Sequence, residues 1–295
     1  MKLVRTALFA PGGKERVMGK AIESGAQAVI LDLEDSVPIA SKAEARALVA
    51  RAIDGAAALA AARPMVTVRT NGAATGLLAD DLAAVVRRGL DAVFLPKVES
   101  VEQMLEAASL LDRAEAAQGL APGIVRIIPM FESALGVVRC YEIARASQRV
   151  LATCIGSARD GDLQTDLGCA WSLEGTELFY ARSKVLLDSR AAGVYSLDGV
   201  FSDIGDEAGF AQDCALSARL GYVGRTLIHP KQILPARRAY AVSESDIAYY
   251  RRVVSEFEAV EKTGTAAITV DGKLVDYAMY QRAKRVLELA RLDGN

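Results

Sequence analysis

Residues 28–35 read Ala-Val-Ile-Leu-Asp-Leu-Glu-Asp, a short apolar run that ends in three acidic side chains. The run is apolar along its length and does not alternate between apolar and polar residues. This pattern is typical of a parallel strand that is buried on both faces. Charged side chains directly after a buried strand are costly unless they are paired or bind something. The stretch therefore predicts a buried strand followed by a polar site.

The same kind of apolar run occurs eight times along the chain. The runs begin at Val4, Ala28, Met65, Ala92, Ile124, Val150, Val194 and Tyr222. Stretches rich in Ala, Leu, Glu and Arg separate them and predict helices, for example over residues 41–59, 101–118 and 176–192. Ser41 has Glu44 three residues later, which predicts a capping box at a helix start. The chain therefore predicts eight successive βα units.

Eight βα units can close into a barrel or form an open, doubly wound sheet. The open sheet would normally carry a glycine-rich phosphate fingerprint after its first strand. Pro11-Gly12-Gly13 matches neither that fingerprint nor a Walker A loop. The length of 295 residues also fits an α/β barrel, which typically has about 250 residues. We therefore predict a (β/α)₈ TIM barrel over residues 1–240.

Residues 241–295 exceed what closing a barrel requires. They predict a helix over 243–262, a turn at Asp271-Gly272 within 266–275, and a last helix over 277–292. Apolar residues recur at helical spacing in that last helix, at Ala283, Val286, Leu287 and Ala290. We predict a C-terminal helical extension, or lid, that packs on the barrel or on a neighbouring subunit of a homo-oligomer.

Composition excludes several classes of partner. A net charge of −2 and a pI of about 5.7 predict neither a nucleic-acid surface nor a polybasic membrane anchor. The apolar runs are well short of the roughly 20 residues of a transmembrane helix, and the first residues lack the apolar core of a signal peptide. The four cysteines have no CxxC spacing and predict buried free thiols. We expect a soluble, cytoplasmic protein.

Polar residues gather where the predicted strands end, which is where barrel enzymes carry their chemistry. In chain order these ends supply Asp32, Glu34, Asp35, Arg69, Asn71, Lys97, Glu99, Glu132, Asp160, Asp162, His229 and Lys231. A rim of carboxylates without a histidine cluster suits a hard cation with oxygen ligands, and Mg²⁺ is the natural choice. Arg69 would stabilise an anionic oxygen beside it. The rim therefore predicts metal-assisted enolate chemistry.

Structural roles compete with this interpretation at several positions. Glu34 and Asp35 can instead pair with Lys42 or Arg46, and Glu99 can cap a helix. His229, the one histidine of the sequence, is more often a structural hydrogen-bonding residue than a base. Since no Gly-x-Ser-x-Gly elbow accompanies it, a hydrolase is not favoured.

Seven segments, in order, resemble the citrate lyase β-subunit/malyl-CoA lyase family (HpcH/HpaI aldolase-like). They are Arg5-Thr-Ala-Leu-Phe-Ala-Pro-Gly12, Asp32-Leu-Glu-Asp-Ser-Val37, Arg69-Thr-Asn71, Pro96-Lys-Val-Glu-Ser100, Glu132-Ser-Ala-Leu-Gly-Val137, Glu174-Gly-Thr-Glu-Leu178 and Gly224-Arg-Thr-Leu-Ile-His-Pro-Lys-Gln-Ile233.

The resemblance implies a site whose residues can be carried over by motif. Glu132 matches a Mg²⁺ ligand that also contacts substrate, and Arg69 matches the arginine that binds the substrate carboxyl or oxo group. Counting back from Asp166-Leu-Gly places the second ligand at Asp162, whereas counting forward from Gly156 favours Asp160; we take Asp162. The match also places Arg5 and Lys14 in the first βα loop, near the nucleotide part of coenzyme A. 

The tail resembles that of the longer family members. Asp276 matches an aspartate that acts as general acid or base at the active site of the adjacent subunit, in a homotrimer or hexamer. The implied function is a Mg²⁺-dependent carbon–carbon lyase that cleaves or forms a 3-hydroxyacyl-CoA such as citramalyl-CoA or malyl-CoA. The alternative is the citryl-carrier-protein lyase (β) subunit of citrate lyase. We expect the free CoA lyase, because the resemblance implies that carrier-dependent subunits end soon after the eighth unit.

Overall fold

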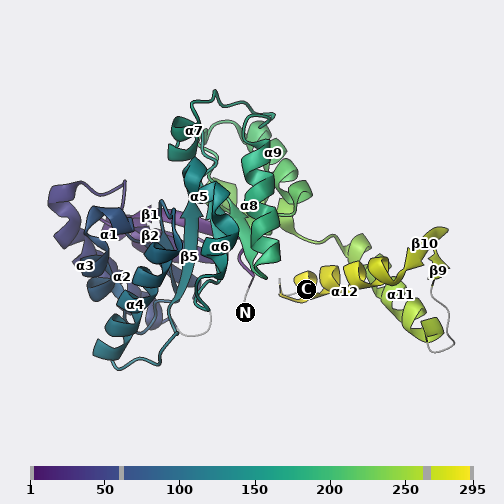
Figure 1. The fold of residues 1–295 in the computed structure, drawn as a ribbon, viewed down its shortest axis with the longest axis horizontal. Coiled ribbons are helices and arrows are strands. Elements are labelled where there is room, and N and C mark those ends of the chain that lie inside the picture. Colours follow the sequence, from purple (N-terminus) through teal and green to yellow (C-terminus); the bar gives the residue numbers. More distant parts are fainter. Residues whose placement is uncertain (1–2, 60–62, 262–266, 293–295) are drawn as a thin grey trace. The chain divides into compact units, whose positions relative to one another are not determined.

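A computed structural model describes residues 3–59, 63–261 and 267–292. Eight parallel strands close into a barrel in chain order, with β8 pairing back to β1 (Figure 1). They are β1 (Thr6–Pro11), β2 (Ala28–Asp32), β3 (Met65–Arg69), β4 (Ala92–Leu95), β5 (Arg126–Phe131), β6 (Ala152–Ile155), β7 (Tyr195–Asp198) and β8 (Gly224–Leu227). Each predicted apolar run overlaps one strand, so the predicted (β/α)₈ barrel is confirmed.

Helices follow the strands along the chain. They are α1 (Glu15–Ile22), α2 (Lys42–Ala57), α3 (Leu78–Val85), α4 (Val101–Ala117), α5 (Ala134–Val138), α6 (Cys140–Arg145), α7 (Asp162–Leu167), α8 (Phe179–Ala191), α9 (Glu207–Leu220) and α10 (Ile233–Tyr240). In α4 the buried residues Met104, Ala107 and Leu111 are three and four positions apart and form one apolar face. Among the described helices, none is long and apolar enough to span a bilayer.

The predicted capping box at Ser41 is wrong. Ser41 precedes α2, but its side chain makes no cap hydrogen bond, because its backbone (φ −101°, ψ 1°) lacks the extended conformation of a typical N-cap. The neighbouring Lys42 makes the side-chain contacts at this helix start. Its buried ammonium donates to the carbonyl oxygens of Leu33 at 2.5 Å and Glu34 at 2.7 Å. This contact fixes the acidic loop that follows β2.

The four cysteines are free thiols, and three of them are buried; Cys169 is half-buried. Burial, assisted by nearby Asp188, raises the pKa of the Cys140 thiol to about 12. A thiol with so high a pKa is almost entirely protonated near neutral pH and is a poor nucleophile. Cys140 is therefore a packing residue.

A buried network of charges joins β7 and β8 to the helices outside them. Arg182 of α8 pairs with Asp198 at the end of β7 and lies 3.0 Å from Asp213 of α9. Arg225 of β8 lies 2.7 Å from Asp213 and donates to the carbonyl oxygen of Gly199. We call Arg182, Asp198, Asp213 and Arg225 the β7–β8 network. It has two positive and two negative side chains, and it fixes the backbone just after β7.

The chain from Tyr240 onward forms a second compact unit, separate from the barrel unit of Val4–Ala239. It contains α11 (Glu244–Glu261), an antiparallel hairpin of β9 (Ala267–Val270) and β10 (Lys273–Asp276), and α12 (Tyr277–Leu292). Asp271 and Gly272 both have positive φ values, of 50° and 75°. Such a pair is typical of the two-residue turn of a β-hairpin. The predicted helix, turn and helix of the tail are thus present.

The second unit has its own hydrophobic core. Val253 and Phe257 of α11, Val270 and Val275 of the hairpin, and Tyr280 and Ala283 of α12 form this core. The rings of Phe257 and Tyr280 stack with centroids 4.7 Å apart. Part of the apolar face of α12 is therefore covered within its own unit. The helical stripe does not by itself require a neighbouring subunit, and the oligomeric state remains a prediction.

Candidate active site

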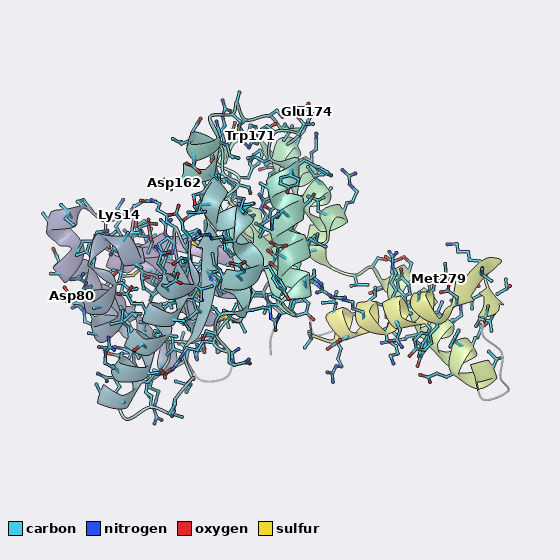
Figure 2. The ribbon with its side chains drawn as sticks, viewed as in Figure 1. Lys14, Asp80, Asp162, Trp171, Glu174 and Met279 are labelled. Carbon is cyan, nitrogen blue, oxygen red and sulfur yellow. The ribbon has the colours of Figure 1, made fainter. Side chains whose placement is uncertain are left out.

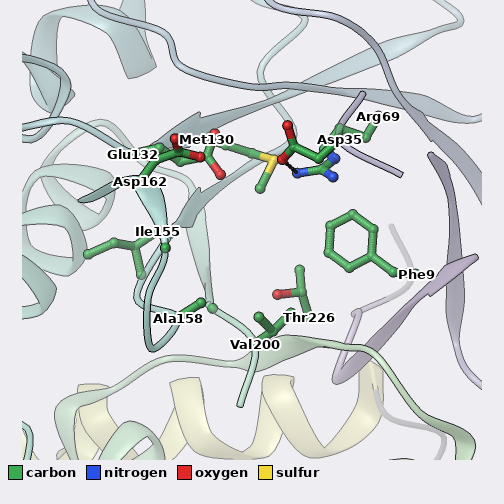
Figure 3. A pocket seen from close by; sticks show the side chains of 13 residues that line it. Phe9, Asp35, Arg69, Met130, Glu132, Ile155, Ala158, Asp162, Val200 and Thr226 are labelled. Atoms are coloured by element: carbon green, nitrogen blue, oxygen red, sulfur yellow. Dashed lines mark ion pairs between the residues drawn. The ribbon is translucent and has the colours of Figure 1, made fainter. Parts of the chain in front are cut away.

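A pocket lies where the strand ends of the barrel meet (Figure 3). It is lined by Phe9, Asp35, Arg69, Met130, Glu132, Ile155, Gly156, Ala158, Gly161, Asp162, Gly199, Val200 and Thr226. The structure thus brings Arg69, Glu132 and Asp162 together, from three different βα units, as the sequence predicts. Apolar side chains such as Phe9, Met130 and Ile155 form much of the remaining wall.

Arg69, the last residue of β3, is held in place by the acidic end of β2. Its Nε and Nη2 donate to the two carboxylate oxygens of Asp32 at 2.7 and 2.9 Å. Its Nη1 lies 2.9 Å from Glu34 and 3.4 Å from Asp35. Burial disfavours the charged form of Asp32, but the hydrogen bonds and charge of Arg69 outweigh it and keep the pKa of Asp32 below its usual value. Asp32 therefore orients Arg69, a role that the sequence analysis did not assign.

Glu132 follows β5 and is almost fully buried in the pocket wall. One of its oxygens accepts a hydrogen bond from the backbone N–H of Lys97 at 3.1 Å. Burial, together with the negative charges of Glu34 and Asp162, raises the pKa of Glu132 to about 7, against the opposing effect of Arg69. Gly156 makes room for this carboxylate, because a Cβ there would lie 2.6 Å from the Cγ of Glu132.

The structure separates the two candidate aspartates after β6. Asp162 begins α7 and lines the pocket, where Figure 3 shows its side chain beside that of Glu132. Asp160 has a left-handed backbone (φ 59°), and its carboxylate is exposed and lies 3.7 Å from Arg159. The geometry therefore supports Asp162 as the partner of Glu132.

The donor set of this pocket fits a magnesium ion. Glu132 and Asp162 supply two carboxylates on one wall, and the pKa of Glu132 is raised by burial first, then by the charges of Glu34 and Asp162. Among the residues that the structure describes, no three His, Cys, Asp or Glu side chains form a ready-made metal cage. Mg²⁺ needs no such cage, since it is commonly held by one or two carboxylates and completes its shell with water and substrate.

Three carboxylates and two cations complete the surroundings of this pair. The ammonium of Lys97 lies 3.1 Å from Glu34, 3.9 Å from Asp35 and 3.3 Å from Asp162. We call Asp32, Glu34, Asp35, Arg69, Lys97, Glu132 and Asp162 the rim network. Lys97 was one of many rim residues in the sequence, and nothing in its spacing marked it as the residue that links the carboxylates.

The expected position of Arg5 is wrong. Arg5 precedes β1, at the opposite end of the strand from the pocket, and it is buried. Its Nη1 donates to the carbonyl oxygen of Val223 at 3.0 Å. It therefore does not lie in the first βα loop, where the resemblance placed it. Lys14 does lie in that loop, directly before α1, with an exposed side chain (Figure 2).

The structure also decides the competing roles of the other rim residues. The carboxylate of Glu34 pairs with Arg69 and Lys97. Lys42 contacts the backbone carbonyl of Glu34 instead, and Arg46 pairs with Asp81. Glu99 accepts a hydrogen bond from the Ser133 hydroxyl at 2.6 Å, while Ser100 caps α4. His229 accepts from the backbone N–H of Lys231 and caps a short 3₁₀ turn, Pro230–Gln232. The histidine therefore has the structural role that the sequence favoured.

Asp276 is the last residue of β10, in the second unit. Its side chain is exposed, and its Oδ1 accepts a hydrogen bond from the backbone N–H of Met279 at 2.9 Å. It therefore caps α12, which was the structural alternative for this residue. Among the residues that the structure describes, none donates a hydrogen bond to its other carboxylate oxygen.

Comparison with known proteins places the chain in a family. Residues 5–230 match the family described as HpcH/HpaI aldolase/citrate lyase. The chain belongs to this family. It is 36% identical to the citrate lyase subunit beta of Leuconostoc mesenteroides subsp. cremoris, over 98% of this chain and 94% of that protein. It is 30% identical to the L-malyl-CoA/beta-methylmalyl-CoA lyase of Cereibacter sphaeroides, over 98% and 95%.

A solved structure agrees with this membership. The protein CitE from Mycobacterium tuberculosis, in complex with magnesium, acetoacetate and coenzyme A, has a TM-score of 0.71 and 28% identity, and each chain covers 98% of the other. Relatives on both sides of the family are named lyases. This protein is thus a carbon–carbon lyase.

The tail does not distinguish the two kinds of relative. The citrate lyase β subunit aligns over 293 residues and 98% of this lyase, so its similarity extends through the second unit. The malyl-CoA lyase also aligns over 98% of the chain. The expectation that carrier-dependent subunits end after the eighth βα unit is therefore wrong.

Proposed function

We propose that this lyase is Mg²⁺-dependent and cleaves, or forms, a 3-hydroxyacyl-CoA such as citramalyl-CoA or malyl-CoA. The products of cleavage are acetyl-CoA and a 2-oxo acid. The observation that carries the proposal is the convergence of Glu132 and Asp162 with Arg69 in one pocket at the strand ends. A rim with surplus carboxylates suits a divalent cation, and an arginine beside it suits an anionic substrate.

The reaction requires one bond to break and two protons to move. The hydroxyl group loses its proton and becomes the oxo group, while the carbon–carbon bond breaks. The bonding electrons pass to the thioester fragment as an enolate, which then takes up a proton at carbon. Glu132 and Asp162 would hold Mg²⁺, which supplies Lewis-acid polarisation of substrate oxygens when bound. Arg69 would bind the carboxylate or the developing oxo group, held in position by Asp32.

Asp276 is our candidate for the residue that donates a proton to the enolate carbon in cleavage and removes it in the reverse reaction. Among the described residues, the exposed carboxylate of Asp276 has one oxygen beyond the cap of α12 that accepts no hydrogen bond. The carboxylates of the pocket would be committed to the cation and to Arg69. We propose that Asp276 acts on the active site of an adjacent subunit, in a homotrimer or hexamer. Lys14 would offer its ammonium to a phosphate of coenzyme A.

The alternative substrate is a citryl thioester on a carrier protein, as part of a citrate lyase. The 36% identity to a citrate lyase β subunit favours it, and the 30% identity to a malyl-CoA lyase favours the free CoA ester. Both substrates need the same pocket chemistry. They differ in the group that carries the thioester.

Product analysis tests the proposal and separates the alternatives. Purified protein is incubated with Mg²⁺ and malyl-CoA, citramalyl-CoA, citryl-CoA or the citryl carrier protein, and products are identified by mass spectrometry. We expect acetyl-CoA and a 2-oxo acid from one of the CoA esters. Turnover confined to the carrier-bound citryl group supports the alternative. Release of free coenzyme A without an oxo acid, or full turnover in excess EDTA, refutes the proposed reaction.

Mixed oligomers test the role of Asp276. Asp276→Asn and Glu132→Gln should each be inactive, because they remove the proton donor and a metal ligand. If Asp276 acts on the adjacent subunit, co-assembly of the two variants should restore part of the activity. No recovery in verified mixed oligomers, or an active monomer, contradicts the shared site. 

A further inference from the structure

Lys97 links the rim network through both its backbone and its side chain. It directly follows Pro96, after β4, with a left-handed backbone (φ 53°), which is uncommon for a residue other than glycine. Its N–H donates to Glu132 at 3.1 Å, while its ammonium lies 3.1 Å from Glu34 and 3.3 Å from Asp162. A strained backbone is kept when the surrounding structure requires it, and such residues cluster at functional sites.

In the rim network, negative side chains outnumber positive ones, so the charge of the Lys97 ammonium strongly affects the net charge of the site. The network contains five carboxylates and two cations, Arg69 and Lys97. Arg69 is committed to Asp32 through two hydrogen bonds. Lys97 is thus the network's other positive charge, and its side chain is 41% exposed. It lies against a candidate ligand of the metal as well as against Glu34.

We propose that Lys97 is a positioning residue that balances the affinity of the site for two ligands of opposite charge. Its ammonium weakens the binding of the divalent cation and strengthens the binding of the anionic oxo acid. The inference rests on the proposed function, because it takes Glu132 and Asp162 as the residues that hold Mg²⁺.

The two effects follow from one charge. An ammonium 3.3 Å from Asp162 competes with a cation for that carboxylate and repels it, which lowers the affinity for Mg²⁺. With the network at two positive and five negative side chains, an added Mg²⁺ brings the sum to about −1. Without Lys97 the sum would be about −2, and an incoming carboxylate would be repelled more strongly. The charge at residue 97 therefore lowers the affinity for Mg²⁺ and raises the affinity for the oxo acid.

Three substitutions separate the parts of this residue. Lys97→Met removes the charge and keeps most of the aliphatic stem. Lys97→Gly also removes the charge but suits the left-handed backbone, so the N–H to Glu132 is retained even if the methionine variant folds poorly. Lys97→Arg keeps the positive charge. Lys20→Met is the matched control, since Lys20 is an exposed lysine of α1 outside the rim network.

Calorimetric titration measures both affinities without relying on turnover. Magnesium chloride is titrated alone; then glyoxylate, pyruvate and oxaloacetate are titrated at saturating Mg²⁺, and the acid that binds wild type best is used. In Lys97→Met and Lys97→Gly we expect the Kd for Mg²⁺ to fall and the Kd for the oxo acid to rise, each by at least about fivefold. Lys97→Arg and Lys20→Met should keep both constants within about twofold of wild type.

Opposite shifts in the two constants support the inference, since a merely misfolded site would weaken both ligands. Weaker binding of both, or no change in either, in the methionine and glycine variants overturns it. If wild type itself does not bind Mg²⁺, the proposed function fails and the inference fails with it. If wild type binds Mg²⁺ and the variants do not differ, only the inference fails.

Discussion

The β7–β8 network and the rim network of the barrel differ in how their charges balance. The β7–β8 network pairs two arginines with two aspartates, and all four side chains are almost completely enclosed. The rim network sets two cations against five carboxylates, and Asp35, Asp162 and Lys97 are partly open to solvent. A buried, balanced network satisfies itself. A surplus of one sign at an open pocket favours the binding of a ligand of the other sign, so the imbalance points to the site.

The largest effect is expected from removing the surplus charge itself. Glu132→Gln or Asp162→Asn should lower kcat/KM by about 10³-fold or more, because each replaces a carboxylate ligand by a weaker neutral one. Thermal unfolding of Glu132→Gln should be unchanged or shifted upward, since the neutral amide removes a charge that burial disfavours. Asp160→Asn is the control and should stay close to wild type. Loss of activity in Asp160→Asn with normal Asp162→Asn would instead place the metal ligand at residue 160.

The next effect is expected in the balanced network and concerns stability. Asp198→Asn should lower the free energy of unfolding by about 3–5 kcal/mol, because it leaves the buried Arg182 without its full countercharge. Turnover per folded molecule should change far less than in Glu132→Gln. Asp54→Asn removes an exposed ion pair with Arg87 and should cost at most about 1 kcal/mol. Chemical denaturation measures both variants. Equal costs for the two would mean that enclosure of the network has no energetic weight.

A smaller effect is expected from changing the shape of a rim cation while keeping its charge. Arg69→Lys should lower kcat/KM by more than about tenfold, or about 1.4 kcal/mol, because an ammonium cannot hold Asp32 and a substrate oxygen in the same fork geometry. Arg63→Lys is the control. Arg63 makes a similar two-pronged contact with Asp91, but it precedes β3, at the other end of the barrel from the pocket. Wild-type kinetics in Arg69→Lys would exclude the substrate role of Arg69.

The smallest effect is expected when the pH is lowered and the stability that the β7–β8 network contributes is measured. Burial opposes the charged form of Asp198, but Arg182 and Arg225 outweigh it and lower its pKa from 3.8 to about 2. A group whose pKa is lower in the folded state stabilises the protein at pH values above its pKa in the unfolded state. This stabilisation is lost as the pH falls through the pKa of the folded state. The difference in unfolding free energy between wild type and Asp198→Asn should be constant from pH 7 to about pH 5. It should narrow below pH 3.8; a difference that shrinks already near pH 6 would contradict the assignment.

The fold was largely predictable because its signal is repeated. Eight apolar runs each predict a buried parallel strand, and an error at one run would not change the barrel. The polar strand ends likewise predicted that Arg69, Glu132 and Asp162 would meet. The predicted position of Arg5 was wrong for a geometric reason. The motif that contains it spans a whole strand, so Arg5 and Gly12 lie at opposite ends, roughly 20 Å apart at about 3.3 Å per residue.

The remaining site residues depend on features that a sequence does not encode locally. The role of Lys97 rests on a left-handed backbone and on the reach of a four-carbon stem to two other loops. The choice between Asp160 and Asp162 rests on the path of one loop. The length of the tail does not separate free CoA lyases from citrate lyase β subunits, because relatives of both kinds align over it.

Gly156 sets a limit on how the site can vary by mutation. Every other amino acid carries a Cβ atom, which at this position would lie within 2.6 Å of the Cγ of Glu132. No amino-acid substitution at residue 156 can therefore avoid a collision with the side chain proposed to hold the metal. Gly13 offers the contrast, since nothing lies within 4 Å of a Cβ built there. Other amino acids therefore fit sterically at residue 13. A variant with another amino acid at residue 156 needs compensating changes around Glu132.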